Sequence, residues 1–303
     1  MPYKHFGKDK NNMLVLATHV HGGLGNRLFQ TCFLYALAKR HGVHFHYSQW
    51  QHPSPHSQNV YPDLMQRFME DPLYIERLPA NAHTTDHHEK GDDFMSYTEA
   101  WDHIVQDANQ SNNQPTVLFF HGFFQTERFF APYESQIRLH LREPINVTRK
   151  IDAKYNHILP SLETSVFVHV RLGDYVQNFL YKHFVDLNAY YRRCISDVQA
   201  RAPGTTFVLV CNDQANLYKY YAPLLQTLAS TKWVSFNEPD ELLNLYLMAR
   251  CQVGGICSNS TYSWWASWLG SAENKRVYMP SRWIKGPAHH GIYPHNAIVV
   301  PTD

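Results

Sequence analysis

The chain has 303 residues, of which 44% are hydrophobic, 14% aromatic and only 17% charged, so it can bury a sizeable core and is not an intrinsically disordered protein. Its 27 Lys and Arg residues nearly balance its 26 Asp and Glu residues, and the net charge of +1 offers no general field for binding a nucleic-acid backbone or an anionic membrane. The length allows one large domain or two modest ones.

Cysteine usage and hydropathy further narrow the kinds of protein that this chain can be. The five cysteines form no C-x-x-C pair and lie mostly within apolar segments, so we expect reduced core residues rather than zinc ligands or disulfides. No run approaches the ~18 apolar residues that span a membrane, and the apolar stretch 13–20 is followed by glycines rather than by a cleavage site. We therefore expect a cytoplasmic protein without a membrane segment in this chain.

The first half opens with a predicted strand at 13–18, an apolar run that ends in a glycine-rich turn. A helix is expected next, because apolar residues recur at helical spacing until His41-Gly42 stops the pattern. Segment 49–115 is rich in proline and histidine and is predicted to be loop-rich structure that shapes an acceptor site. A strand at 116–120 then runs into the sequence GFFQ, followed by a helix that carries residues 127–129.

The second half alternates strands with helices. We expect strands at 165–170, 206–211, 232–236, 252–256 and 276–279, and helices at 187–199, 214–228, 240–251 and 262–269. This succession predicts a parallel sheet flanked by helices. Right-handed crossovers then place the carboxyl ends of all the strands on one edge, where open α/β folds bind their ligands.

The first strand of this half ends in His169 and Arg171, which share one face of the strand, followed by Gly173 and Asp174. A guanidinium at the sheet edge can hold a phosphate through two parallel hydrogen bonds and keeps its charge at any working pH. An ion pair between Arg171 and Asp174 that merely fastens a turn is an equally good interpretation.

Two further strand ends carry polar residues. Asn212 and Asp213 could accept hydrogen bonds from a base or a ribose, although capping of the next helix explains them more simply. The sequence SNST at 258–261 follows Gly254-Gly255 and precedes a Trp-rich helix, an arrangement that favours an anion site at the helix start over simple N-capping. The tryptophans themselves are expected to pack in the core.

Several familiar signatures are missing. The turn at 21–26 lacks the third glycine of a dinucleotide fingerprint, and no strand is followed by a phosphate-binding loop of the Gly-Lys-Ser/Thr kind. We find no Asp-x-Asp pair and no His-Glu-x-x-His motif, and we interpret His87, His88 and Glu89 as solvated residues of a polar loop. No metal site and no cofactor are predicted.

Four segments together resemble the α-1,2-fucosyltransferases of glycosyltransferase family eleven, which use GDP-fucose. The segments read HGGLGNRLFQ at 21–30, GFFQ at 122–125, HVRLGDYV at 169–176 and SNSTYSWW at 258–265, and they occur in the family's order. The resemblance covers about residues 14 to 280, and its last motif is the most specific.

The resemblance implies an α/β, GT-B-like fold of two Rossmann-type halves with parallel sheets. Residues 1–155 would form the acceptor-side domain and residues 156–303 the GDP-sugar-binding domain. It also implies metal-independent transfer with inversion at the fucose anomeric carbon. Arg171 matches the first arginine of the family's His-x-Arg-Arg-Gly-Asp motif and would bind the diphosphate, whereas Leu172 replaces the second arginine. Arg27 replaces a common glutamine and could supply a compensating positive charge.

The remaining roles follow from the same resemblance. His169 and Asp213 would lie near guanine or ribose, Ser260 and Thr261 would face the diphosphate, and Gly23 with Asn26 would approach the sugar and the acceptor. The predicted site comprises Arg171 and Asp174 for catalysis, with Asp174 as the candidate base; His169, Arg171, Asn212, Asp213, Asn259, Ser260, Thr261 and Ser263 for the donor; and Gly23, Asn26, Arg27 and Gln125 for the cleft between donor and acceptor.

The sequence thus predicts a fucosyltransferase that moves L-fucose from GDP-fucose to a hydroxyl of a galactose-like acceptor, with a glycan and GDP-fucose as its partners. Three alternatives stay open. They are a GDP-sugar-binding protein without turnover, for which Leu172 is the main argument, a transferase for another GDP-6-deoxyhexose, and an enzyme that uses a different nucleotide. The glycosylation patterns at Asn146 and Asn259 are interpreted structurally.

Overall fold

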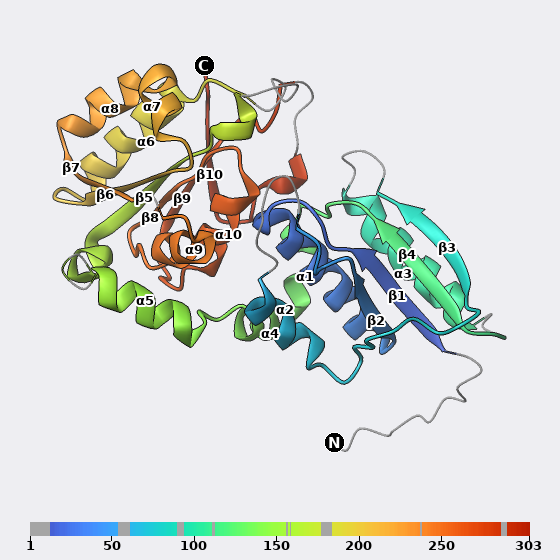
Figure 1. Ribbon diagram of the computed structural model, residues 1–303. Coiled ribbons are helices and arrows are strands. Elements are labelled where there is room, and N and C mark those ends of the chain that lie inside the picture. Colours follow the sequence, from blue (N-terminus) through green and yellow to red (C-terminus); the bar gives the residue numbers. More distant parts are fainter. Residues whose placement is uncertain are drawn as a thin grey trace. The chain divides into compact units, whose positions relative to one another are not determined.

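The computed structural model describes residues 13–53, 61–89, 94–110, 113–155, 157, 159–176, 184–236, 238–285 and 290–303 (Figure 1). The chain divides into two compact units, Met1–Leu141 and Arg142–Asp303. Each unit is built around its own parallel sheet, as the fold class predicted from the sequence requires.

The N-terminal unit contains a four-stranded sheet in the order β2-β1-β4-β3, with every pairing parallel. Its strands are β1 (Leu14–His19), β2 (His44–Ser48), β3 (His83–His88) and β4 (Thr116–His121). Its helices are α1 (Leu24–His41), α2 (Pro62–Met69), α3 (Phe94–Gln110) and α4 (Glu134–His140), with single 3-10 turns η2 (Glu127–Phe129) and η3 (Ala131–Tyr133). The expected helix at 127–129 is thus only a 3-10 turn.

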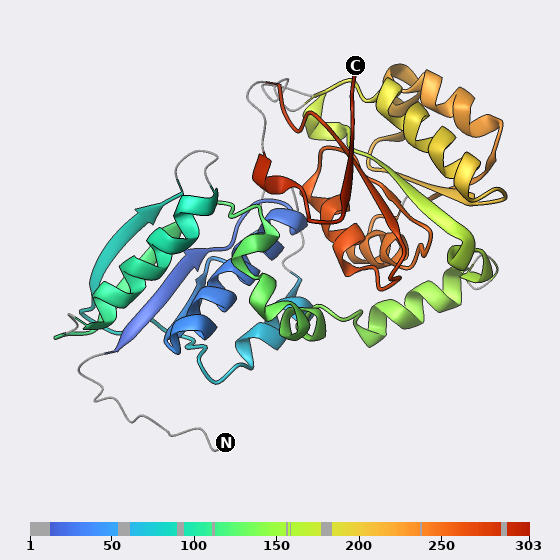
Figure 2. The same ribbon diagram turned by 180° about the vertical axis from the view of Figure 1, so that it is seen from behind.

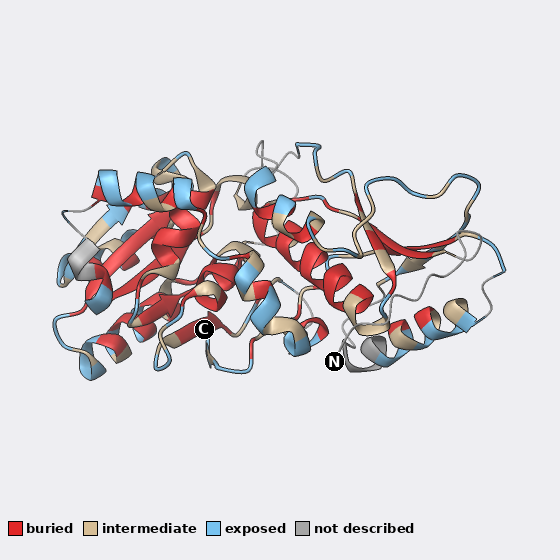
Figure 3. Ribbon diagram, turned by 90° about the horizontal axis from the view of Figure 1, so that it is seen from below, coloured by how far each residue is buried: buried red, intermediate tan, exposed pale blue. Residues whose placement is uncertain are grey.

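Helix α1 fills the core of this unit and is buried along most of its length (Figure 3). It ends where the sequence predicted, because Gly42 adopts the left-handed conformation (φ 63°) and its N–H donates to the carbonyl of Ala38. Helix α3 packs beside it (Figure 2). Trp101 of α3 makes edge contacts to the rings of Phe33 in α1 and Phe120 in β4. Both helices therefore cover the same face of the sheet.

The prediction of loop-rich structure between 49 and 115 is wrong. This segment contains α2, β3 and α3. Pro62 stands at the first turn of α2, where a missing N–H costs no hydrogen bond. Strand β3 lies at the edge of the sheet and has the sequence HTTDHH, which lacks the apolar alternation that identifies a strand.

The C-terminal unit contains a six-stranded parallel sheet in the order β10-β9-β8-β5-β6-β7. Its strands are β5 (Ser165–Val170), β6 (Thr206–Cys211), β7 (Lys232–Phe236), β8 (Gly254–Ile256), β9 (Arg276–Pro280) and β10 (Ala297–Val300). Its helices are α5 (Ile145–Tyr155), α6 (Asn188–Arg201), α7 (Gln214–Tyr220), α8 (Ala222–Ala229), α9 (Glu241–Ala249) and α10 (Thr261–Leu269), with 3-10 turns η4 (Leu159–Thr164), η5 (Gly173–Tyr175) and η7 (His290–Ile292).

The expected alternation of strands and helices is confirmed here, with two differences. The single helix expected at 214–228 is divided at Tyr221 into α7 and α8, because Pro223 in the first turn of α8 cannot donate to the preceding turn. Strand β10 had not been identified from the sequence.

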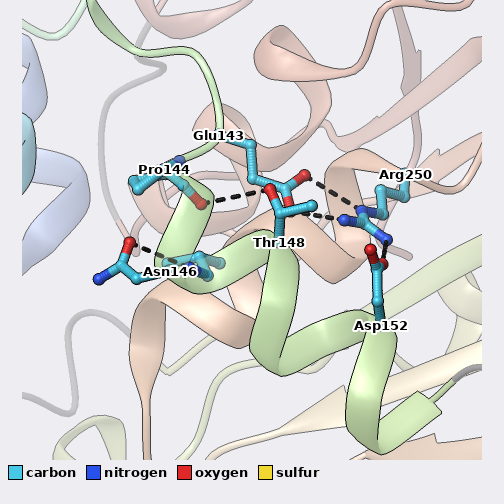
Figure 4. Close-up of polar contacts among 7 residues, drawn as sticks. Glu143, Pro144, Asn146, Thr148, Asp152 and Arg250 are labelled. Carbon is cyan, nitrogen blue, oxygen red and sulfur yellow. Dashed lines mark hydrogen bonds and ion pairs between the residues drawn. The ribbon is translucent and has the colours of Figure 1, made fainter.

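Helix α5 belongs to the C-terminal unit, which begins at Arg142, whereas the sequence placed the boundary after residue 155. Arg250, at the end of α9, holds this segment (Figure 4). Its guanidinium donates to both carboxylate oxygens of Glu143, at 2.6 and 3.1 Å, and to Asp152 at 2.9 Å. The hydroxyl of Thr148, in the glycosylation pattern at 146–148, donates to the carbonyl of Pro144 in the same segment.

Buried aromatic and sulfur-bearing side chains complete the two cores. Trp264 and Trp265 have no exposed surface, which confirms that they pack in the core. All five cysteines are free and buried, as expected, and burial raises the pKa of Cys32, Cys194 and Cys251.

Among the residues described above, no helix is both long and apolar enough to cross a bilayer.

Strand β8 has a glycine at position 255 because the neighbouring ring of Phe167 occupies the space that a side chain would need. A Cβ added at Gly255 would lie 2.1 Å from this ring. We predict that Gly255→Ala lowers the free energy of unfolding by about 1–3 kcal/mol through overpacking. Urea denaturation measures this change. In a Phe167→Leu background the same substitution should cost clearly less, and strictly additive losses would contradict the assignment.

Candidate functional site

The carboxyl ends of β5 and β8 meet side by side, and a buried histidine joins them. His169 is 2% exposed, and its Nδ1 lies 2.8 Å from Oγ of Ser258, the second residue after β8. Burial, reinforced by the charge of Arg171, lowers the pKa of His169 from 6.5 to about 3. The imidazole is therefore neutral at physiological pH and serves as a hydrogen-bonding link.

Arg171 projects just beyond this link. Its Nη2 donates to Oδ1 of Asp174, and its guanidinium carbon lies 5.5 Å from the ring centroid of Tyr175. The Arg171 and Asp174 side chains are 23% and 28% exposed, so the pair lies at the surface and not in the core. The Tyr175 hydroxyl donates to the carbonyl of Asn259 at 3.1 Å. The ion pair considered at the sequence level thus exists, and it presents the guanidinium beside the SNST segment.

Leu172, which stands where the family has a second arginine, packs in the hydrophobic core of the unit. Its side chain has no exposed surface and belongs to the same cluster as Val170 and Leu187. Its backbone N–H donates to Oδ1 of Asn212 at 2.8 Å. The next residue, Gly173, adopts φ +57°, and a Cβ there would lie 2.6 Å from Nδ2 of Asn212. The turn that carries Arg171 is therefore shaped by a glycine and an amide.

Asn212 and Asp213 both have partners within the protein. Asp213 caps α7, accepting from the backbone N–H of Asn216 at 3.1 Å and from its side-chain Nδ2 at 2.6 Å. The side-chain hydrogen bond from Asn216 lowers the pKa of Asp213, with a further contribution from the backbone of Gly173. The simpler sequence-level interpretation, helix capping, is thus realised, and contact with a base or ribose stays a prediction.

The SNST segment enters α10 through a network of its own. Ser260 is the N-cap and accepts from the N–H of Tyr262 at 3.3 Å, while the hydroxyl of Ser263 donates back to the Ser260 carbonyl. The Asn259 amide is 3% exposed and donates to the carbonyl of Trp283, so this glycosylation pattern is structural. Thr261, the first residue of α10, is only partly buried. The helix start is thus rigidly placed at the sheet edge that carries Arg171.

In the N-terminal unit, Arg27 is buried rather than displayed. It is 3% exposed and donates to three backbone carbonyls, those of Gly22, Trp50 and His52, at 2.7 to 2.9 Å. These bonds tie the start of α1 to the segment after β2. The expectation that Arg27 supplies a charge to the cleft therefore gains no support from its geometry.

Asn26 and Gln125 lie together, with Gln125 Nε2 donating to Asn26 Oδ1 at 2.9 Å. Gly23, the N-cap of α1, is three residues before Asn26 and is partly exposed.

Glu89 lies at the carboxyl edge of the same sheet. Its Oε2 accepts from the N–H groups of Phe123 and Phe124 at 2.9 and 3.1 Å, so its interpretation as a solvated loop residue is wrong.

Three histidines lie in one row across the carboxyl edge of this sheet. His88 pairs with His121 in the strand register, their rings stack at 4.6 Å, and His19 lies 5.8 Å from His121. His121 Nε2 lies 2.7 Å from Asp86, and this hydrogen bond lowers the pKa of Asp86. Within the described ranges, no group of three or more His, Cys, Asp or Glu side chains is arranged to hold a metal ion.

The sequence did not identify two tyrosines of α6 whose hydroxyls donate to backbone carbonyls at the strand ends of the site. Tyr191 of α6 donates to the carbonyl of His169 at 2.7 Å, and Tyr190 donates to the carbonyl of Cys257 at 2.7 Å. Burial raises the pKa of both phenols, so they remain donors. The only available signal was a Tyr-Tyr pair within an amphipathic helix, where buried hydroxyls need partners that the sequence does not identify.

Comparison with known proteins assigns the family. A family model described as Glycosyl transferase family 11 matches residues 15–284, so the chain belongs to that family, as its motifs indicated. An alpha-1,2-colitosyltransferase of Escherichia coli is 29% identical over 168 residues, which cover 55% of this chain and 56% of that protein. The O-antigen biosynthesis glycosyltransferase WbnK of Escherichia coli is 29% identical over 146 residues, 44% and 43% of the two chains. The matches thus span about half the length of these relatives.

Solved structures show the fold. POFUT1 in complex with GDP superimposes with a TM-score of 0.51 at 12% identity, covering 96% of this chain and 98% of that chain. The apo form of POFUT1 gives 0.50 at 12% identity, with 88% and 97% covered. The predicted α/β, GT-B-like class with two parallel sheets is confirmed.

The depressed pKa of His169 predicts a defined pH dependence of stability. Between pH 6.5 and about 3, the unfolded chain binds a proton at this residue that the folded chain does not, so stability is complete above 6.5 and falls as the pH drops. We predict that the free energy of unfolding, compared with that of His169→Asn, declines by about 1.4 kcal/mol per pH unit below about pH 6. Denaturant titrations of both proteins at several pH values measure this difference in the free energy of unfolding. Because both proteins contain the other histidines, the contributions of those histidines cancel. A pH-independent difference would contradict the assignment.

Proposed function

We propose that this member of glycosyl transferase family 11 transfers L-fucose from GDP-fucose to a hydroxyl, the 2-OH of a galactose-like sugar, on a glycan acceptor, with inversion and without a metal ion. The observation that carries the proposal is Arg171. It stands at the carboxyl edge of the C-terminal sheet, held by Asp174 and Tyr175 beside the start of α10.

The proposed reaction is a direct displacement. A bond forms between the acceptor oxygen and the anomeric carbon, the bond from that carbon to the diphosphate oxygen breaks, and its electron pair leaves with GDP. Negative charge therefore grows on the diphosphate in the transition state. A guanidinium already in place stabilises that charge more than it stabilises the ground state.

Two neighbouring features support this role for Arg171. The N-terminal turn of α10 begins next to it, with the Ser260 and Thr261 hydroxyls at the positive end of the helix dipole. The neutral His169 adds no second positive charge that would repel the guanidinium. Asp174 stays the candidate base. Because its pairing with Arg171 weakens a carboxylate as a base, in the proposal it takes the acceptor proton after the diphosphate has replaced it on Arg171.

A second donor is favoured by a specific observation. One relative, 29% identical over about half its length, is an alpha-1,2-colitosyltransferase, and colitose is the 3-deoxy counterpart of fucose. A protein that binds the GDP-sugar without turnover is a further alternative. Its main argument was Leu172, and the burial of this side chain removes it from the surface that presents Arg171.

We predict that Arg171→Ala lowers kcat for transfer by ~100- to 1000-fold, because one donor to the leaving group is lost. Release of GDP in the presence of GDP-fucose and lactose measures the rate. Arg201→Ala provides the matched control, since Arg201 forms an exposed pair with Asp197 in the same unit and should leave the rate unchanged. Near-normal turnover of Arg171→Ala would sink the leaving-group assignment.

We also predict that transfer survives complete chelation of divalent ions with EDTA, because the guanidinium and the helix start carry the diphosphate charge. The same assay, run with GDP-fucose and with GDP-colitose, ranks the two donors by kcat/KM. Activity that disappears on chelation and returns with Mn²⁺ would contradict the metal-independent mechanism. Binding of both nucleotides without product would favour the protein that lacks turnover.

A further inference from the structure

Two turns at the carboxyl edge of the N-terminal sheet bring an imidazole and a phenyl ring together at the surface. Strands β1 and β4 are parallel neighbours, and the turns that follow them carry His21 and Phe123. The two rings have centroids 5.3 Å apart and planes inclined by 40°. His21 is exposed, and Phe123 is 41% exposed. The pair forms a small aromatic surface at the edge where parallel sheets bind ligands.

The outward position of Phe123 is imposed by the backbone. The next residue, Phe124, has φ +51°, a left-handed conformation that is unfavourable for a bulky side chain. This conformation lets Phe124 turn inward, where it is fully buried and stacks on Phe33 at 3.8 Å, while Phe123 points to solvent. The Glu89 carboxylate accepts from both of their N–H groups and stabilises the turn. Backbone strain of this kind is concentrated at binding and active sites, which makes this turn a candidate for ligand binding.

A glutamine joins the two turns rigidly. Gln30 of α1 is fully buried and accepts from the His21 N–H at 2.9 Å, while its amide donates to the carbonyl of Gly122 at 3.1 Å. The bond between Gln125 and Asn26 adds a second connection. The aromatic surface is therefore preorganised, which lowers the entropic cost of binding.

We infer that His21 and Phe123 form a platform that binds the apolar face of a pyranose of the acceptor. This inference rests on the proposed function. A platform of one phenyl and one imidazole ring matches a single sugar ring in size, whereas a stable protein partner would need an interface of about 1,000 Å² or more. A galactose-like ring, whose axial hydroxyl leaves one face with a continuous patch of C–H groups, fits an aromatic surface with a polar imidazole at its margin.

The experiment compares transfer with donor hydrolysis in substituted proteins. With lactose as the acceptor probe, Phe123→Ala should raise the KM for lactose about tenfold, equivalent to the loss of one favourable ring contact. It should leave hydrolysis of GDP-fucose by water unchanged. Phe123→Trp should keep the KM near the wild-type value. Tyr218→Ala, which removes a ring that is 69% exposed in the other unit, is the matched control and should have no effect.

A direct binding measurement separates this inference from the proposed function. Saturation-transfer NMR with methyl β-galactoside and the protein alone should show transfer to the ring C–H protons in the wild type and its loss in Phe123→Ala. If the wild-type protein neither hydrolyses GDP-fucose nor transfers fucose from it, the proposed donor is wrong. The NMR result then still shows whether Phe123 binds a galactose ring. An unchanged KM together with an unchanged NMR signal would overturn the platform. Equal losses in donor hydrolysis and in transfer would place Phe123 on the donor side and would also overturn it.

Glu89 is the positioning residue of this platform. Glu89→Ala removes the acceptor for both N–H groups and should raise the KM for lactose severalfold with no change in donor hydrolysis, whereas Glu89→Gln, which keeps an acceptor oxygen, should restore most of the binding. A purely structural role for Glu89 would instead lower donor hydrolysis and acceptor binding together.

Discussion

A neutral imidazole at the end of β5 holds together the two motifs on which the C-terminal unit depends. His169 links its own strand to Ser258 after β8. The hydrogen bond from Tyr175 to Asn259 makes a second link between the same two segments. A protonated imidazole here would be buried beside the positive charge of Arg171, so burial and the proposed role of Arg171 both favour the uncharged form. The positions of Arg171 and of the α10 helix start are therefore set by one short chain of hydrogen bonds.

The two arginines of the motifs illustrate how burial decides what a charge can do. Arg27 is enclosed, and its donors are directed at the backbone carbonyls of Gly22, Trp50 and His52. Arg171 is partly exposed and paired with the Asp174 carboxylate, an interaction that the diphosphate, with its higher charge, would replace in the proposed mechanism. The same residue type thus shapes a loop in one unit and presents a charge in the other.

Much of the fold could be predicted from the sequence, because the buried parallel strands are continuous apolar runs and the helices between them have apolar faces. Strand β3 could not, since an edge strand with one partner needs no apolar face. In the site, the residue types at the strand ends pointed to Arg171, Asp174 and the SNST segment. Two partners of Arg27, Trp50 and His52, and two partners of Glu89 lie more than twenty residues away in the chain, and no local pattern records such pairings.

The tyrosine hydroxyls of α6 extend the site to the opposite side of the sheet. Because the hydroxyls of Tyr190 and Tyr191 donate hydrogen bonds to the carbonyls of Cys257 and His169, any shift of this helix also moves both strand ends. In the proposed mechanism, substitutions on the buried face of α6 would therefore change the rate without altering any residue proposed to contact the substrate. For protein engineering, the inner surface of α6 offers a means of adjusting the candidate site while the residues proposed to bind the donor keep their identity.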